Sequence, residues 1–216
     1  MQRETLASRP GSNSLPADAV RLPTDANNAK AELRAQLRAA LRDVSPAARA
    51  ESSAALCARV IASSVWQSAR AVLLFFPVAS EPDISPLLAA ALAENKVLAL
   101  PRFNCALGSY EAVRVTDPAR ELVTGPFQVR EPAAHCVVLD RKPLDLALVP
   151  GLGFDARGGR LGRGKGHYDR LLAGFTGGKL GVAFDCQLVP TVPREPHDIA
   201  LDAIVTPTRW LDARAS

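Results

Sequence analysis

A run of glycines and basic residues between positions 150 and 174 is suited to binding phosphate. It reads PGLGFDARGGRLGRGKGHYDRLLAG and follows the apolar segment LDLALV at residues 144–149. Glycine lets backbone N–H groups approach phosphate oxygens closely, and Arg160, Arg163 and Lys165 add charged donors. A helix beginning at HYDRLLA would add its positive N-terminal end. The pattern therefore predicts a phosphate site in a strand–loop–helix unit, and a mobile basic surface loop is the alternative.

Two common nucleotide-binding motifs fit this run only in part. Gly159 to Lys165 has the spacing GxxxxGK, but Gly166 stands where a P-loop carries the Ser or Thr that binds the metal. Gly151 to Ala156 matches a loose GxGxxA pattern, but no helix is expected to open there. The residues therefore predict phosphate binding without assigning either nucleotide-binding fold.

Composition and charge narrow the class of protein. The chain has 216 residues, of which 48% are hydrophobic and 22% charged, as in ordinary globular proteins. No apolar run approaches the length of a membrane span. The net charge is +4, and much of the positive excess falls in residues 155–170, which favours a localised anion site over a generally basic surface. Aromatic residues are only 5% and the bases are concentrated, so a nucleic-acid-binding module is disfavoured.

The four cysteines lie far apart in the sequence, without a CxxC pair or clustered histidines. They are therefore expected to be free thiols rather than a disulfide framework or a zinc site.

The elements that must position the glycine run alternate between helices and buried strands. Helices are expected from about Lys30, from Ser45-Pro46 to about Ser64, and after Ser85-Pro86, where Ser before Pro indicates a helix start. Continuous apolar runs predict strands at 71–76, 96–100, 144–149, 179–184 and 202–206. The more alternating segment 110–115 is expected to be an edge or hairpin strand.

These elements predict an α/β fold, a three-layer Rossmann-like domain with a mostly parallel sheet flanked by helices. Residues 1–28 are expected to be a disordered tail, and 29–216 a single domain. In such sheets ligands bind at the carboxyl ends of the strands, where the glycine run should lie.

Three segments together resemble the 5-formyltetrahydrofolate cyclo-ligase family. PGLGFDARGGRLGRGKGHYDR is similar to the family pattern GxRLGxGxGYYDR, and LGVAFDCQLVPTVPREPHDIALDAIVTP contains its GxAFxxQ and PxxxHDxxxDxxxT elements. KAELRAQL matches its opening KxxLRxxL. The resemblance covers about residues 29–209 and implies an ATP- and Mg²⁺-dependent conversion of 5-formyltetrahydrofolate to 5,10-methenyltetrahydrofolate. It also implies an enzyme that acts on small molecules. From composition, charge and the lack of an apolar signal segment we expect a cytoplasmic protein that binds neither nucleic acid nor membrane, and we expect a monomer.

Carried over position by position, the resemblance implies three groups of site residues. Those for ATP are Lys30, Arg34, Arg160, Leu161, Gly162, Arg163, Gly164, Lys165, Gly166, His167 and Tyr168. Those for the folate are Glu81, Asp83, Phe127 and Tyr168, and those for Mg²⁺ are Asp169 and Asp198.

The chain departs from the family pattern in two places. His167 replaces the first tyrosine of Tyr-Tyr-Asp, and Pro82 and Ile84 replace the usual residues of an ExDT element. Selectivity for the folate is the property these changes are expected to affect. The alternative is another phosphoryl-transfer or sugar-phosphate enzyme that uses the same glycine run.

Overall fold

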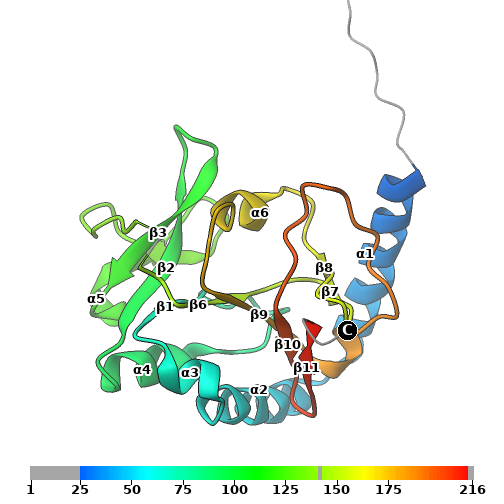
Figure 1. The fold of residues 1–216 in the computed structure, drawn as a ribbon, viewed down its shortest axis with the longest axis horizontal. Coiled ribbons are helices and arrows are strands. Elements are labelled where there is room, and N and C mark those ends of the chain that lie inside the picture. Colours follow the sequence, from blue (N-terminus) through cyan, green and yellow to red (C-terminus); the bar gives the residue numbers. More distant parts are fainter. Residues whose placement is uncertain (1–24, 141–142, 214–216) are drawn as a thin grey trace, which may run out of the picture.

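The computed structural model describes residues 25–140 and 143–213, which form a seven-stranded sheet covered on both faces (Figure 1). The strands lie in the order β11-β10-β9-β6-β1-β2-β3. The central pairs are parallel, and the edge strands β3 and β11 run antiparallel to their neighbours. Their bounds are Ala71–Leu73 (β1), Val97–Asn104 (β2), Ser109–Val115 (β3), Leu146–Val149 (β6), Gly178–Val182 (β9), Ala203–Val205 (β10) and Trp210–Asp212 (β11). The predicted α/β fold with a mostly parallel sheet is confirmed.

The central strands are continuous apolar runs because both of their faces are buried. Alternate residues of β1 enter different cores: Val72 packs with α2, α3 and α4, whereas Ala71 and Leu73 pack with residues around α6 on the opposite face. Strand β3 lies at the sheet edge beside β2, as its sequence predicted, and Val113 on its outer side forms an isolated antiparallel bridge with Val138.

Helices and short connecting elements complete the fold. The helices are Asp25–Asp43 (α1), Pro46–Ile61 (α2), Ser64–Ser68 (α3), Ser85–Ala93 (α4), Pro118–Glu121 (α5) and His167–Leu171 (α6), with a 3₁₀ turn at Asp185–Gln187 (η1). Two hairpins, Leu122–Thr124 with Arg130–Pro132 (β4, β5) and Gly153–Phe154 with Arg160–Leu161 (β7, β8), were not predicted. Among the described residues, no helix is both long enough and apolar enough to cross a membrane.

Three helix boundaries differ from the expectation. α1 begins at Asp25, so residues 25–28 belong to a helix and not to the tail; residues 1–24 lie outside the described residues. α2 ends at Ile61 because the chain starts the short α3 at Ser64. Ser45 caps α2 as predicted, accepting from the Ala48 N–H. Ser85 does not cap α4, because it is already helical and its N–H donates to the Asp83 carboxylate at 2.9 Å.

Candidate active site

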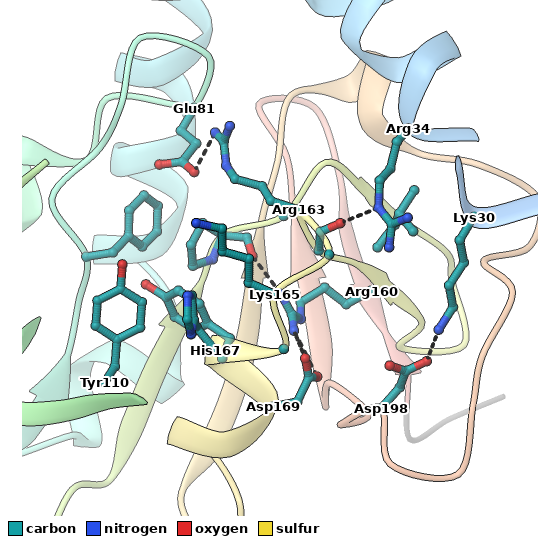
Figure 2. Close-up of a pocket in the computed structure, with 18 of the residues that line it drawn as sticks. Lys30, Arg34, Glu81, Tyr110, Arg160, Arg163, Lys165, His167, Asp169 and Asp198 are labelled. Atoms are coloured by element: carbon teal, nitrogen blue, oxygen red, sulfur yellow. Dashed lines mark hydrogen bonds and ion pairs between the residues drawn. The ribbon is translucent and has the colours of Figure 1, made fainter. Parts of the chain in front are cut away.

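A cavity of about 630 Å³ lies beyond the carboxyl end of β6, where the glycine run leaves the sheet (Figure 2). It is enclosed by α1, the β7–β8 hairpin, α6, the segments after β1 and β4, and the segment before β10. Its lining includes every residue predicted for ATP and both acids predicted for Mg²⁺. Of the four residues predicted for the folate, Glu81, Phe127 and Tyr168 line the cavity and Asp83 does not.

The glycine run forms the wall of the cavity that faces α1. The Arg34 Nε–H donates to the Gly162 carbonyl at 3.0 Å, which fixes the middle of the run against α1. Gly164 and Gly166 have φ of +101° and +61°, a region that favours glycine, and Gly166 is the residue before α6. The turn therefore needs these two glycines for its shape, and it leaves Arg163 and Lys165 exposed at the cavity.

Arg160 is buried beneath this wall and forms an ion pair with Asp169 that contains two hydrogen bonds. Its Nη2 lies 2.9 Å from each carboxylate oxygen of Asp169, and its Nη1 donates to the Pro150 carbonyl. The guanidinium also lies over the Tyr168 ring, 5.7 Å from its centroid. Asp169, which the sequence assigned to Mg²⁺, lines the cavity, and both of its carboxylate oxygens accept hydrogen bonds from Arg160 (Figure 2).

Lys30 joins α1 to the segment that precedes β10. Its ammonium donates to Glu195 and to Asp198, each at 2.7 Å, and only 6% of the residue is exposed. Burial acts to lower the pKa of Lys30, but the two hydrogen bonds outweigh it and the pKa is raised. Burial likewise acts to raise the pKa of Asp198, and the Lys30 and Glu195 N–H bonds reverse this and lower it.

One group of potential metal ligands lies at this ion pair. Glu195, His197 and Asp198 offer ligand atoms that lie within 4.8 Å of one another. Sequence reasoning assigned Asp198 and overlooked Glu195 and His197, although all three stand in the segment PREPHD. Nothing in the sequence places Lys30, 165 residues away, between these two carboxylates.

Glu81, in the segment after β1, is the acid on the side of the cavity away from Lys30 (Figure 2). One carboxylate oxygen accepts from the Val78 N–H at 3.1 Å and the other from Arg163 at 3.1 Å. Burial raises the pKa of Glu81, although both of these contacts act to lower it. The carboxylate and Arg163 point toward each other across the top of the cavity (Figure 2).

Asp83, two residues further on, is a correction to the predicted site. It is exposed, its carboxylate accepts from the Ser85 N–H at the start of α4, and its N–H donates to Ser53. Because its carboxylate is directed to the helix start, Asp83 has a structural role in the helix and does not reach the cavity.

The rings of Tyr110, Phe127 and His167 form an aromatic wall of the cavity. The His167 ring lies edge-on to Phe103 and to Tyr110, with centroids 5.2 Å away in each case, and near Phe127. Lys165 lies over the face of Phe127 at 4.3 Å. Tyr110 was missed by sequence reasoning, since a strand residue at a sheet edge gives no signal of a binding site.

The contact with Arg170 selects one tautomer of the neutral His167 ring. Its Nδ1 lies 2.8 Å from Arg170, which can only donate, so Nδ1 accepts and the proton of the neutral ring is on Nε2. Burial, followed by the charges of Arg170 and Lys165, lowers the pKa of His167. The buried Nε2 has no hydrogen-bond partner within the described part of the chain.

Comparison with known proteins shows which family this chain is similar to. Residues 26–207 match the model of the 5-formyltetrahydrofolate cyclo-ligase family. The chain is 30% identical to the mouse 5-formyltetrahydrofolate cyclo-ligase, with 83% of this chain and 94% of that protein covered. It is 34% identical to the Mycolicibacterium smegmatis 5-formyltetrahydrofolate cyclo-ligase, over 85% and 96% of the two chains.

A solved structure agrees with the fold and the family. The 5,10-methenyltetrahydrofolate synthetase of Aquifex aeolicus superposes with a TM-score of 0.77 at 32% identity, over 86% of this chain and 93% of that one. The match of the family model spans the whole cavity lining from Asn27 to Asp198. The chain therefore belongs to the 5-formyltetrahydrofolate cyclo-ligase family.

Proposed function

We propose that this protein converts 5-formyltetrahydrofolate to 5,10-methenyltetrahydrofolate, with ATP split to ADP and phosphate. The observation that carries the proposal is that one cavity joins a basic glycine run to a buried carboxylate and an aromatic wall. The first feature suits a triphosphate, and the other two suit a ring that bears N–H donors. Membership of the family supports this pairing of substrates.

In the proposed reaction, the formyl oxygen attacks the γ-phosphorus and ADP leaves. The folate N10 then attacks the activated formyl carbon and loses its proton to solvent, and the C–O bond breaks to release phosphate. No protein nucleophile is needed, so the chain contributes position and charge. Arg163 and Lys165, exposed at the cavity, would neutralise phosphate oxygens, while Glu81 would accept from the pterin N–H groups.

The donor set also fits Mg²⁺, which prefers oxygen ligands and retains several waters. Glu195 and Asp198 each bond to Lys30 through one carboxylate oxygen, and within the described residues Glu195 Oε1 and Asp198 Oδ1 accept no hydrogen bond. These two acids would hold the ion, which would neutralise phosphate charge. Lys30 would keep both carboxylates ionised and in place. Asp169, the other predicted ligand, would need to share its oxygens with Arg160.

The test is to mix the purified protein with 5-formyltetrahydrofolate, ATP and Mg²⁺ and to follow the near-ultraviolet absorbance of methenyltetrahydrofolate. We expect the absorbance to grow only when ATP and Mg²⁺ are both present. A flat trace from folded protein that binds ATP would refute the proposal and favour another phosphoryl-transfer reaction at the same glycine run.

A further inference from the structure

The backbone of the glycine run at Lys165 is held by a residue that lies outside the cavity. This residue is Arg170 of α6, which is not among the described residues that line the cavity. Its Nη2 lies 3.0 Å from the Lys165 carbonyl oxygen and 2.8 Å from Nδ1 of His167. Nη2 carries two hydrogens, so it can donate one to each of these acceptors. Arg170 therefore ties the glycine run to the first turn of α6.

The same guanidinium reaches the β2–β3 hairpin, which extends beyond the sheet beside α6 (Figure 1). Nη2 lies 3.3 Å from the carbonyl oxygen of Gly108, in the turn that joins the two strands. Gly108 has a φ of +60°, so glycine suits the turn that presents this carbonyl. One side chain thus stands where the glycine run, α6 and the hairpin meet.

His167 forms a second link between α6 and the hairpin. Its ring packs edge-on against Phe103 and Tyr110, which are partners across the β2–β3 pair. Nδ1 can accept from Arg170 only while the ring is neutral, because both nitrogens of a protonated imidazole are donors. The tyrosine of the family pattern carries its one oxygen at the far end of the ring, so it offers no acceptor at the place of Nδ1. The contact is therefore a feature of the histidine in this chain.

We propose that His167 and Arg170 are positioning residues: their contact holds the glycine run in the shape that receives phosphate, and protonation of His167 breaks it. The inference rests on the proposed function, because it assigns how the run is held for ATP. A protonated His167 places a second positive charge against the Arg170 guanidinium and takes away its acceptor. Arg170 then moves away from the Lys165 carbonyl, and the run loses its support from α6.

The surroundings of His167 make this contact sensitive to pH. Burial and then the charges of Arg170 and Lys165 lower the pKa of His167. Burial raises the pKa of Tyr110, so its phenol is neutral wherever histidine titrates. The rings packed against His167 are those of Phe103 on β2, Tyr110 on β3 and Phe127 after β4. The imidazole is therefore neutral near pH 7 and gains its proton below the ordinary histidine pKa of about 6.5.

The test measures binding of ATP with Mg²⁺ by calorimetry on the full-length protein, without folate, from about pH 8 to about pH 5. His167→Phe keeps a ring against the hairpin but removes the acceptor and the titrating group. Arg170→Gln removes the guanidinium from the same contact. The matched control, His135→Phe, replaces an exposed imidazole that does not line the cavity. Turnover of 5-formyltetrahydrofolate is measured alongside and tests the proposed function separately.

Near pH 8, we expect His167→Phe and Arg170→Gln to bind ATP about three- to tenfold more weakly than native protein, the factor of one typical hydrogen bond. On acidification the native protein should lose this advantage and approach the two variants, because its own contact breaks. The control should follow the native protein at every pH. Protonation of ATP itself acts on all four proteins alike, so the difference between native protein and variant reports the contact.

Two results overturn the inference. Equal affinity of native protein and Arg170→Gln at every pH means that the contact does not hold the run. A native advantage that grows in acid means that a protonated His167 attracts the triphosphate directly. If His167→Phe does not fold, as judged by circular dichroism, the comparison with Arg170→Gln decides alone. Binding of ATP with this pH dependence but without turnover refutes the proposed reaction and leaves the inference standing, whereas native protein that does not bind ATP refutes both.

Discussion

Replacing Asp169 by asparagine should destabilise the protein and should also slow the proposed reaction. The carboxylate accepts two hydrogen bonds of 2.9 Å from Arg160, and the side chains are only 16% and 5% exposed. Removing one member of a buried ion pair typically costs about 3–5 kcal/mol, because the other charge stays buried without its partner. Asparagine retains one acceptor oxygen, so we expect a loss of about 2–3 kcal/mol in the free energy of unfolding.

Urea unfolding followed by circular dichroism measures this loss. The control is Asp117→Asn, which alters an exposed pair with Arg120 whose atoms are 3.6 Å apart, and its expected effect is below about 1 kcal/mol. Asparagine also keeps the cap that Asp117 gives to α5. If Asp169→Asn unfolds at the same urea concentration as the native protein, the ion pair does not hold Arg160 in place. A Mg²⁺ titration of the same variant then tests its predicted role as a ligand.

Three further predictions concern the same cavity. Lys165→Ala should raise the KM for ATP by about ten- to a hundredfold, the value of one charge-assisted hydrogen bond, and leave thermal unfolding unchanged because Lys165 is exposed; near-normal kinetics would remove Lys165 from the phosphate site. Asp198→Asn should increase the Mg²⁺ concentration needed for half-maximal rate, measured by titration at saturating ATP, and an unchanged titration would exclude Asp198 as a ligand. Because burial raises the pKa of Glu81, the folded protein binds that proton more readily than the unfolded chain, so stability should fall as the pH rises from the ordinary glutamate pKa through the raised value. Melting temperatures at a series of pH values should show this fall in native protein and a flatter profile in Glu81→Gln; parallel profiles would contradict the assignment.

The sequence predicts the sheet well because its central strands carry an unambiguous pattern. Val72 and Leu148 belong to uninterrupted apolar runs, and both are fully buried between the two layers that cover the sheet. Strands β7 and β8 could not be predicted, because two residues are too few to show a repeating pattern of apolar residues. The start of α4 was placed wrongly for a different reason. Asp83 and Ser85 both carry an oxygen that can accept from a backbone N–H at the start of the helix, and the local sequence does not decide between them.

The candidate site also has a part that the sequence predicts and a part that it does not. The glycine run is contiguous, so its residues and their shared cavity could be predicted together. Contacts between distant segments could not be predicted in this way. Arg160 and Asp169 are nine residues apart, whereas Lys30 and Asp198 are 168 residues apart. Tyr110 and Glu195 enter the site only because β3 and the segment before β10 fold against α6 and α1.

The ion pair between α1 and the segment before β10 has a consequence for biosynthesis. Lys30 is synthesised 165 residues before Glu195 and 168 residues before Asp198. Until residues 195–198 have been made, α1 therefore lacks the two carboxylates that hold Lys30. A nascent chain that stops before residue 195 has the glycine run but an open end to its cavity. The contact that joins α1 to the segment before β10 should thus be a late step of folding during synthesis, formed only after the glycine run is complete.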